Sequence, residues 1–314
     1  MASRMRALVT GGAGFIGSNL VDALVDRGDE VTVLDDVSTG RRENLDRAVA
    51  GGAELVEADV RDTEAVTRAC ERARPETIFH LAAQIDVRRS VADPVHDLEV
   101  NVGGTINVLA AALYAGVRRF VNTSTGGAIY GEAQILPAPE SHPVAPEAPY
   151  GQSKFAAEGY CELFRRLHGL SSVSVRYGNV YGPRQDPLGE AGVIAIFCGK
   201  LLARERPTIY GDGSQTRDYV YVGDVVEANL AAAASDAVGA VNIGTGVETS
   251  VLDLVEILRA LGDGPFDAEH ADARPGEVQR NVLDPSRARE ELGWAATVPV
   301  RAGLERTLAS LRPG

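Results

Sequence analysis

The sequence predicts an α/β fold: a doubly wound parallel (Rossmann) sheet, followed by a smaller mixed α/β C-terminal domain. The first observation is that short apolar runs alternate with helix-length segments through the first 180 residues. Near-continuous apolar strands joined by helices are typical of a parallel sheet covered on both faces. The second is a glycine-rich turn between the first apolar run and the first helix. The third is a change from about Val180 onward, where loops rich in Gly, Pro, Asp and Arg separate shorter helices.

The predicted strands are short, and helical patterns separate them. Strands are expected over Arg6–Thr10, Glu30–Leu34, Ala53–Glu57, Thr77–Leu81, Phe120–Ser124 and Ser172–Arg176. Helices are expected over Ser18–Arg27, Glu64–Ala73, Leu98–Ala115, Gln152–His168, Val193–Ala203, Asp224–Ala233 and Val251–Leu261. The segment Asp218–Ile243 is expected to return to the sheet. We therefore predict one domain from residues 1–178 plus about 218–246, and a second from about 179–217 plus 247–314.

The composition excludes several classes of partner. The 314 residues are 45% hydrophobic and 24% charged, with a net charge of −13. So acidic a chain lacks the basic surface that nucleic acids and anionic membranes attract, and no run approaches the roughly 18 apolar residues of a membrane span. The N-terminus has no apolar signal-peptide region, and Cys70, Cys161 and Cys198 have no metal-like spacing. We expect a cytoplasmic protein with reduced thiols and no metal site.

A glycine-rich turn, Gly11-Gly12-Ala13-Gly14-Phe15-Ile16-Gly17, follows the first predicted strand and precedes the first helix. In this position Gly11 permits a tight turn, Gly14 lets the backbone approach a pyrophosphate, and Gly17 lets the helix pack closely on the strand. The start of the helix offers N–H groups and a partial positive charge to phosphates. The sequence therefore predicts a dinucleotide site.

Asp35 closes the second predicted strand. An acidic side chain there accepts hydrogen bonds from both ribose hydroxyls and repels the 2′-phosphate of NADP, so we predict NAD as the cofactor. Two alternatives stay open. Arg41 and Arg42 are close enough in sequence to hold a 2′-phosphate, and Asp36 can be the ribose partner while Asp35 caps a helix.

Tyr150 and Lys154 are four residues apart and share one face of a predicted helix. A free phenol, with a pKa of about 10, is a poor base at neutral pH, and a fixed ammonium beside it favours the phenolate. We predict that Tyr150 is a general base and acid whose pKa is lowered by Lys154 together with a cationic nicotinamide ring.

These motifs resemble those of the extended short-chain dehydrogenases/reductases of the NAD-dependent epimerase/dehydratase family, most closely the bacterial UDP-glucose 4-epimerases. The resemblance spans nearly the whole chain, and the motifs come in the family's order. The segments that carry it are Thr10–Gly17, Asp59-Val60, His80–Gln84, Tyr150–Lys154, Tyr181–Pro187, Arg217–Val220 and Asn242–Gly246.

The resemblance implies a site for NAD and a site for a UDP-sugar. It places Asp59 and Val60 at the adenine. The implied cofactor residues are Gly11, Gly14, Phe15, Ile16, Gly17, Asp35, Asp36, Asp59, Val60, Leu81, Ala82, Ala83, Asn101, Tyr150, Lys154 and Tyr177. The implied UDP-sugar residues are Gln84, Thr125, Tyr150, Asn179, Arg184, Val193, Tyr210, Arg217, Arg274 and Glu277. Arginines suit this role, because a diphosphate bound to so acidic a protein needs local guanidinium groups.

The implied reaction is the 4-epimerisation of a UDP-hexose through a transient 4-keto sugar. A hydride passes from sugar C4 to NAD while Tyr150 takes the 4-hydroxyl proton, and the hydride then returns to the other face. Relatives place the third catalytic group, a Ser or Thr hydroxyl, where this chain has Gly126. Because side chains of a strand alternate between faces, the offset matters. We expect Thr125 to take this role, with Ser124 as the alternative.

The loop Gly126-Gly127-Ala128 indicates the type of reaction. The related 4,6-dehydratases carry an Asp-Glu pair at this point, and the UDP-glucuronate decarboxylases carry a Glu. This chain has no side chain there for elimination or decarboxylation. The resemblance therefore implies epimerisation alone.

Three other functions stay open at this stage. Arg88, Arg89 or Arg184 can meet the carboxylate of UDP-glucuronate in a UDP-glucuronate 4-epimerase. Asn281 falls where a bulky aromatic excludes the N-acetyl group in relatives, so it can admit UDP-GlcNAc. A non-catalytic NAD(H)-binding regulator has the same fold, although such proteins usually lack the Tyr or the Lys.

The oligomeric state is also implied by the resemblance. Leu98–Ala115 and Gln152–His168 resemble the helices that form the dimer interface of the family. We therefore expect a homodimer.

Overall fold

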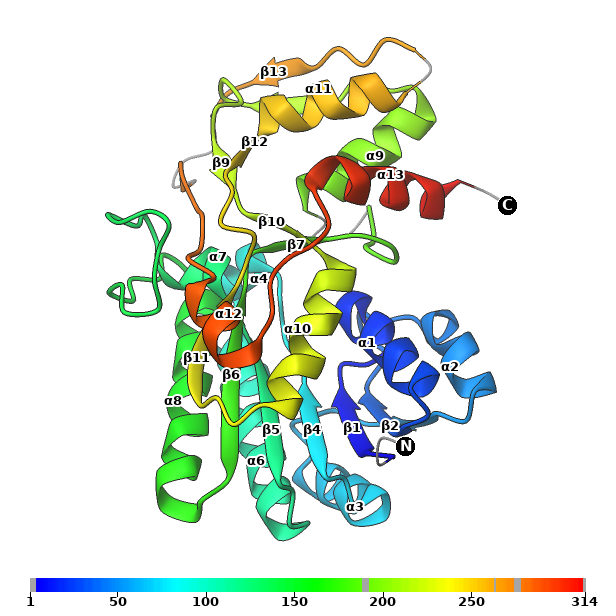
Figure 1. Ribbon diagram of the computed structural model, residues 1–314, viewed down its shortest axis with the longest axis vertical. Helices are drawn as coiled ribbons and strands as arrows, with labels where there is room; N and C mark the ends of the chain where they lie inside the picture. The colour runs from blue at the N-terminus through cyan, green and yellow to red at the C-terminus, as the bar shows by residue number, and fades with distance from the viewer. Residues whose placement is uncertain (1–3, 188–191, 263, 274–277, 313–314) are drawn as a thin grey trace.

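The computed structural model describes residues 4–187, 192–262, 264–273 and 278–312, and its centre is a parallel sheet of seven strands (Figure 1). The strand order is β11-β6-β5-β4-β1-β2-β3, so the direction of winding reverses between β1 and β4. The strands are β1 (Arg6–Thr10), β2 (Glu30–Asp35), β3 (Glu54–Glu57), β4 (Thr77–His80), β5 (Arg119–Thr125), β6 (Ser171–Tyr177) and β11 (Gly239–Ile243). This order confirms the predicted fold class, and its switch point is where doubly wound sheets bind ligands.

Helices cover both faces of the sheet, each over its own apolar cluster. The helices α1 (Phe15–Asp26) and α10 (Val222–Ala234) cover one face, where Leu20 and Val225 are fully buried. The opposite face carries α3 (Thr63–Ala73), α6 (Gly104–Tyr114) and α8 (Pro149–His168). Within the described residues, no helix combines the length and the apolar character that crossing a membrane requires.

Several predicted helices differ from the observed ones; α8, for example, begins at Pro149 instead of Gln152. The first helix begins at Phe15 instead of Ser18, because Gly14 is already its N-cap. The segment predicted as one helix over Leu98–Ala115 is three elements: α5 (Pro94–Leu98), the π-helical turn η2 (Glu99–Gly103) and α6. The wide turn contains Asn101, whose side chain hydrogen-bonds to both backbone groups of Gln84. A π turn of this kind is frequent at functional sites.

A separate lobe stands over the carboxyl ends of the strands, at the top of Figure 1. Its core includes Tyr181, Phe197, Leu254 and Leu304. The elements after β6, other than α10 and β11, are β7 (Asn179–Tyr181), α9 (Val193–Ala203), β8 (Thr208–Tyr210), β9 (Thr216–Arg217), β10 (Tyr219–Tyr221), β12 (Thr249–Ser250), α11 (Val251–Leu261), β13 (Glu269–Ala271), α12 (Ser286–Leu292) and α13 (Val300–Leu311). Short helices before β6 are η1 (Arg42–Leu45), α2 (Asp46–Ala50), α4 (Val87–Ala92) and α7 (Gly126–Ile129).

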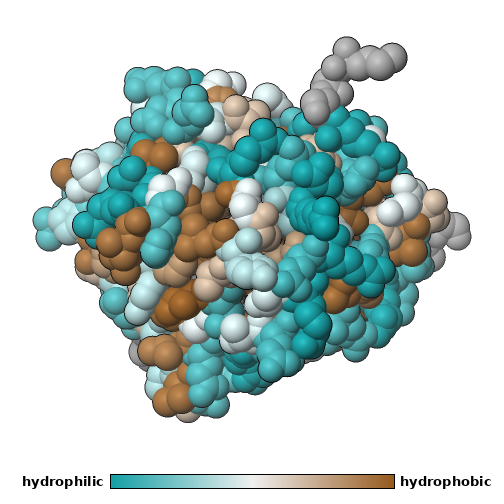
Figure 2. All heavy atoms as spheres, turned by 90° about the horizontal axis from the view of Figure 1, so that it is seen from below, coloured by the Kyte–Doolittle hydropathy of each residue, from teal (hydrophilic) through white to brown (hydrophobic). Residues whose placement is uncertain are grey.

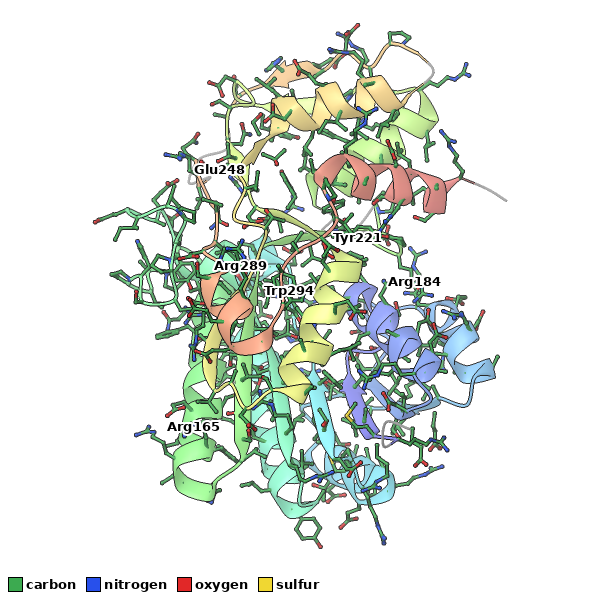
Figure 3. All side chains as sticks on the ribbon, viewed as in Figure 1. Arg165, Arg184, Tyr221, Glu248, Arg289 and Trp294 are labelled. Carbon is green, nitrogen blue, oxygen red and sulfur yellow. The ribbon has the colours of Figure 1, made fainter. Side chains whose placement is uncertain are left out.

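The chain crosses between the two lobes more often than the predicted domain boundaries imply. As predicted, the chain returns to the sheet after residue 218, where β11 pairs with β6. Inside the predicted second domain, however, α12 packs against β11, and Ala288 and Trp294 belong to the core of the sheet. Trp294, labelled in Figure 3, donates its indole N–H to the carbonyl of Asp224 on α10. The division into two domains stays a prediction.

Asp218 joins the two lobes through a fully buried carboxylate. It accepts hydrogen bonds from the backbone N–H and hydroxyl of Thr245 (2.8 and 2.6 Å), from Gly246 N–H (3.1 Å) and from Leu283 N–H (3.2 Å). Its own carbonyl accepts from Asn179 N–H at 2.7 Å. Four donors thus offset the desolvation of one buried charge.

We expect Asp218→Ala to lower the free energy of unfolding by roughly 3 kcal/mol or more, because it leaves several buried donors without an acceptor. Chemical denaturation measures this loss. Asp212→Ala is the matched control: Asp212 also accepts from a backbone N–H and a hydroxyl, both of Ser214, but it is exposed. Equal stability changes in the two variants would contradict the role of Asp218.

Candidate active site

The glycine-rich turn lies at the carboxyl end of β1, in the geometry that a dinucleotide site requires. Gly11 has a φ of 70°, and a Cβ there would lie 2.6 Å from the backbone nitrogen of Ala82. A Cβ on Gly17 would lie 2.1 Å from the carbonyl oxygen of Gly11. Because α1 begins at Phe15, the first-turn N–H groups of Phe15, Ile16 and Gly17 sit next to this turn. The turn therefore presents a helix N-terminus to an anion.

Asp35 and Asp36 differ in position and partners. Asp35 is buried, and its carboxylate accepts from the backbone N–H groups of Ala13 and Val37, both at 2.8 Å. Desolvation raises the pKa of Asp35, and these two hydrogen bonds counter that effect. Asp36 is exposed and accepts from Ser38. The carboxylate that faces the glycine-rich turn is thus Asp35.

The two arginines that bear on the choice between NAD and NADP are both paired with carboxylates. Arg41 contacts Asp186 at 2.7 Å, and Arg42 contacts Glu57. Both guanidinium groups thus have an acidic partner on the surface of the protein. This arrangement favours NAD.

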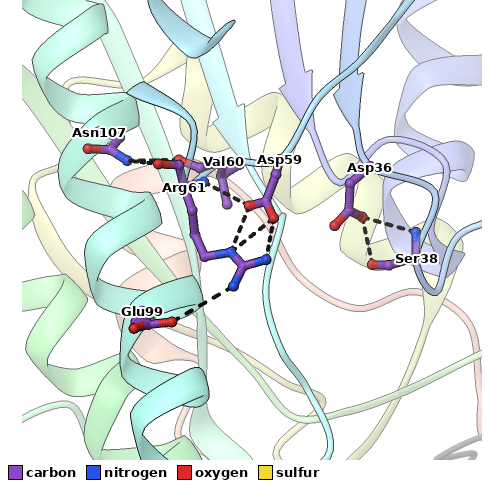
Figure 4. A network of polar contacts seen from close by, with 7 residues as sticks. All are labelled: Asp36, Ser38, Asp59, Val60, Arg61, Glu99 and Asn107. Carbon is purple, nitrogen blue, oxygen red and sulfur yellow. Dashed lines mark hydrogen bonds and ion pairs between the residues drawn. The ribbon is translucent and has the colours of Figure 1, made fainter. Parts of the chain in front are cut away.

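The adenine end of the predicted cofactor site carries a polar network that the sequence motifs did not reveal (Figure 4). Arg61 holds the carboxylate of Asp59 with its guanidinium, lowering the pKa of Asp59, and lies 3.8 Å from Glu99. Asn107 donates to the carbonyl of Val60 at 3.0 Å. A surface cavity of about 630 Å³ lies here, lined by Asp59, Arg61, Asp62, Leu98, Glu99, Gly103 and Asn107. In the sequence, the only sign of this network was that Arg61 follows Asp59 by two residues.

The residues after β4 lie against the same turn. The N–H groups of Leu81 and Ala82 donate to Thr10, and Ala82 is the residue that Gly11 approaches. Leu81, Ala82 and Ala83 are half-buried. They form the wall opposite α1.

Tyr150 and Lys154 lie on α8, as predicted. Lys154 is buried and donates from Nζ to the carbonyl of Thr123 at 3.0 Å. Desolvation lowers the pKa of Lys154 to about 8, and Asp97 opposes this. Desolvation raises the pKa of Tyr150 to about 12, against a hydrogen bond from Thr125 that lowers it. In the protein without a cofactor, burial thus dominates the pKa of Tyr150. The prediction that Lys154 and a cationic nicotinamide ring together lower this pKa stays a prediction.

The two candidate hydroxyls point to different partners. Thr125, the last residue of β5, hydrogen-bonds to Tyr150. Ser124 donates to Glu158 at 2.5 Å, and Glu158 forms a buried ion pair with Arg176 at 2.6 Å. Ser124 is thus part of the packing beneath α8. Only Thr125 of the two contacts the phenol.

Three residues predicted to contact ligands use their polar groups inside the protein. The amide of Gln84 bonds to Asp97 and to the backbone of Asp86. Asn101 bonds to Gln84, Asp97 and Ser153. The hydroxyl of Tyr177 donates to Asn229 at 2.9 Å. The predicted ligand contacts of Gln84, Asn101 and Tyr177 stay predictions.

On the predicted substrate side, Asn179 at the start of β7 lies close to Thr125. Its Oδ1 is buried without a hydrogen-bond partner, and a Cβ on Gly127 would lie 3.5 Å from it and 3.7 Å from the Thr125 hydroxyl. At Gly126 there is no room for a side chain, since a Cβ there would lie 2.5 Å from the side chain of Leu283. Gly127 therefore leaves room for a small side chain between Thr125 and Asn179. The loop Gly126-Gly127-Ala128 itself contributes no acid or base.

The remaining predicted substrate residues are spread over the second lobe. Val193 begins α9, Tyr210 ends β8, and Arg217 is in β9. Arg184, labelled in Figure 3, contacts Asp22 of α1 at 2.5 Å, so its charge is compensated. This pairing counts against a role for Arg184 at a substrate carboxylate. Arg274 and Glu277 lie outside the described residues.

Metal-binding clusters and reactive thiols are the other two kinds of site to consider. In the described part of the chain, no group of three or more His, Cys, Asp or Glu side chains is placed to hold a metal ion. Cys70, Cys161 and Cys198 are buried free thiols, and burial raises the pKa of each, to about 11 for Cys70 and about 12 for the other two.

Comparison with known proteins agrees with this geometry. Residues 7–244 match the NAD dependent epimerase/dehydratase family. The chain is 47% identical to a UDP-glucose 4-epimerase of Mycolicibacterium smegmatis over 98% of this chain and 99% of that protein. It resembles the crystal structure of a Thermotoga maritima UDP-glucose 4-epimerase with UDP-glucose, at a TM-score of 0.93, with 44% identity over 98% of both chains. A Thermus thermophilus UDP-glucose 4-epimerase in complex with NAD has a TM-score of 0.91, with 44% identity over 98% of both chains.

We expect Asp35→Ala to weaken NAD binding by about tenfold or more, because a ribose acceptor and two backbone contacts are lost. Titration of the protein with NAD, followed by calorimetry, measures the affinity. Asp36→Ala is the matched control and should bind NAD nearly as the parent protein does. A stronger effect from Asp36→Ala than from Asp35→Ala would reverse the assignment.

Proposed function

Because the chain belongs to the NAD-dependent epimerase/dehydratase family, we propose that it is a UDP-glucose 4-epimerase that interconverts UDP-glucose and UDP-galactose. The observation that carries this proposal is the hydroxyl–phenol pair of Thr125 and Tyr150 beside Lys154, next to a loop without any acid or base. Relatives that are named UDP-glucose 4-epimerases match over nearly the full length, and this favours glucose over the alternative sugars.

The glycine-rich turn and Asp35 fit NAD. The turn and the start of α1 hold the pyrophosphate through backbone N–H groups, and Asp35 accepts from the ribose. Gly14 lets the backbone approach the pyrophosphate, and Asp59 and Val60 flank the adenine. When bound, NAD accepts and returns the hydride of sugar C4, and its cationic ring adds positive potential beside Tyr150.

Tyr150 moves the proton of the 4-hydroxyl. With a pKa of about 12, the phenol keeps its proton at neutral pH unless positive charge is brought near it. The hydroxyl of Thr125 bonds to the phenol and lies where it can bridge to the sugar oxygen. Tyr150 then acts first as the base and, in the return step, as the acid. Lys154 holds the ribose and keeps a positive charge under the phenol.

The empty flank at Gly127 supports simple epimerisation. Elimination of water needs its own acid and base, and decarboxylation in relatives goes with a Glu at this loop. Here Gly126, Gly127 and Ala128 carry no carboxylate, and the groups beside Gly127 are the Asn179 amide and the Thr125 hydroxyl. Asn179 offers an unpaired amide oxygen, and Arg217 together with Arg274 and Glu277 is proposed to hold the UDP group.

We propose that the protein is a homodimer in the cytoplasm. Apolar side chains that are more than half exposed lie on α4, α5 and α8: Val91, Val95, Leu98 and Leu167. Seen from below, apolar groups interrupt the hydrophilic surface on the left of the view, the side on which α8 lies in Figure 1 (Figure 2). Such a patch is typical of a protein interface. Analytical ultracentrifugation of the purified protein tests it.

We expect Tyr150→Phe to lower kcat by about 100-fold or more while NAD stays bound, because the proton acceptor is lost and the fold is not. Product analysis with UDP-glucose, UDP-glucuronate and UDP-GlcNAc measures activity, with UDP-galactose as the main product of the parent protein. Tyr160→Phe, farther along the same helix, is the control. Turnover of another UDP-sugar in place of UDP-glucose would overturn the proposed substrate, and retained activity of Tyr150→Phe would overturn the role of Tyr150.

We expect Thr125→Val to lower kcat by about 100-fold, because the bond to the phenol is lost. Ser124→Ala should lower kcat only a few-fold and instead cost about 1 to 2 kcal/mol of stability, because Glu158 loses a donor. Steady-state kinetics and denaturation of both variants test this. The opposite pattern would make Ser124 the catalytic hydroxyl.

A further inference from the structure

Asp97, at the end of α5, is a buried carboxylate beside the proposed catalytic pair. Its side chain is 1% exposed. Oδ1 accepts from Nε2 of Gln84 at 2.8 Å and from Nδ2 of Asn101 at 3.1 Å, while Oδ2 is buried without a hydrogen-bond partner. Both partners are amide donors, which is what an ionised carboxylate requires. A charge buried in this way needs a compensating charge nearby.

The partners of Asp97 connect it to α8. Asn101 also donates to Ser153 Oγ at 3.1 Å, and Ser153 Oγ donates to the carbonyl of Tyr150 at 3.0 Å. The helix α5 packs directly on α8. The carboxylate therefore stands at the face of α8 that carries Tyr150 and Lys154.

Of the groups that face Lys154, Asp97 is the one whose negative charge is not already compensated. On α8, Glu158 is paired with Arg176, and burial keeps the thiol of Cys161 neutral by raising its pKa. From the sheet, Thr123 contributes a carbonyl.

The other titratable groups of the sheet near Lys154 are neutral. Burial lowers the pKa of His80 to about 3 and raises the pKa of Tyr177 to about 12. Tyr150 on α8 is neutral as well, because burial raises its pKa. Asp97 is accordingly the strongest of the influences that raise the pKa of Lys154 against desolvation.

We propose that Asp97 is a positioning residue: the buried counter-charge that keeps Lys154 protonated, and the anchor that fixes Gln84 and Asn101 against α8. The same negative charge opposes ionisation of Tyr150. Asp97 thus stabilises the ammonium and the neutral phenol together. Removing its charge must move the titration of Lys154 and of Tyr150 in the same direction, toward lower pH.

The composition of the chain makes this directly measurable, because Lys154 and Lys200 are its only two lysines. In protein labelled with ¹³C at lysine Cε, NMR therefore gives two side-chain signals, which Lys200→Arg assigns. The pKa of Lys154, about 8 in the parent protein, should fall by about 1 pH unit in Asp97→Asn, since an interaction between charges at this depth has that size. Lys200, which pairs with Glu205 on the surface, is the internal reference.

Asp97→Glu keeps the charge and should leave the midpoint of Lys154 close to that of the parent protein. Asp93→Asn, which changes an exposed carboxylate at the start of the same helix, should also leave it unchanged. If Asp97→Asn does not fold, Asp97→Ser removes the charge and leaves room for water to serve Gln84 and Asn101. An unchanged midpoint of Lys154 in a folded, uncharged variant would overturn the proposal.

A second readout rests on the proposed function. Both limbs of the pH profile of kcat should move to lower pH by about 1 unit in Asp97→Asn, whereas a purely structural role would lower the profile without moving it. The NMR titration does not depend on turnover. A parent protein inactive on every UDP-sugar would therefore refute the proposed function and leave the role of Asp97 to be decided by the lysine signal.

Discussion

The buried carboxylate of Asp218 is the contact on which the arrangement of the two lobes depends. It binds donors from the loop after β11 and from Leu283, and its carbonyl binds the first residue of β7. Two glycines make room for it. A Cβ on Gly244 would lie 2.4 Å from Asp218 Oδ2, and a Cβ on Gly178 would lie 2.7 Å from its carbonyl oxygen. The position of Asn179 near Thr125 follows from this junction.

The chemistry of the site is set by burial more than by the identity of its residues. Desolvation raises the pKa of Tyr150 and lowers the pKa of Lys154, so it favours the neutral form of both groups. The hydrogen bond from Thr125 partly lowers the pKa of Tyr150 again, and the charge of Asp97 partly raises the pKa of Lys154. At neutral pH the protein therefore holds Tyr150 as the neutral phenol and Lys154 as the ammonium ion. The positive potential that is still needed to ionise Tyr150 must come with the cofactor. A site of this kind acts only when it is filled, which protects it from side reactions.

The fold was predictable because its signals are local. Apolar strands of a buried parallel sheet and the glycines of the first turn are legible in any short window. The features that could not be predicted depend on contacts between residues far apart in the sequence. Nothing near Arg184 indicates that it pairs with Asp22, 162 residues away. The break of the helix around Asn101 was hidden because the apolar period continues through it. The roles of Thr125 and Ser124 can be told apart only from the structure, where Ser124 binds Glu158 of α8 and Glu158 pairs with Arg176 of β6.

The junction at Asp218 also joins parts of the chain that are far apart in the sequence. Six strands of the sheet are complete by Tyr177, whereas one donor of the junction is the backbone of Leu283, near the end of the chain. The floor under Gly126 is made by the same leucine. One leucine thus links the carboxylate that joins the lobes to the loop that follows β5, so a change in its side chain or backbone is felt at both places.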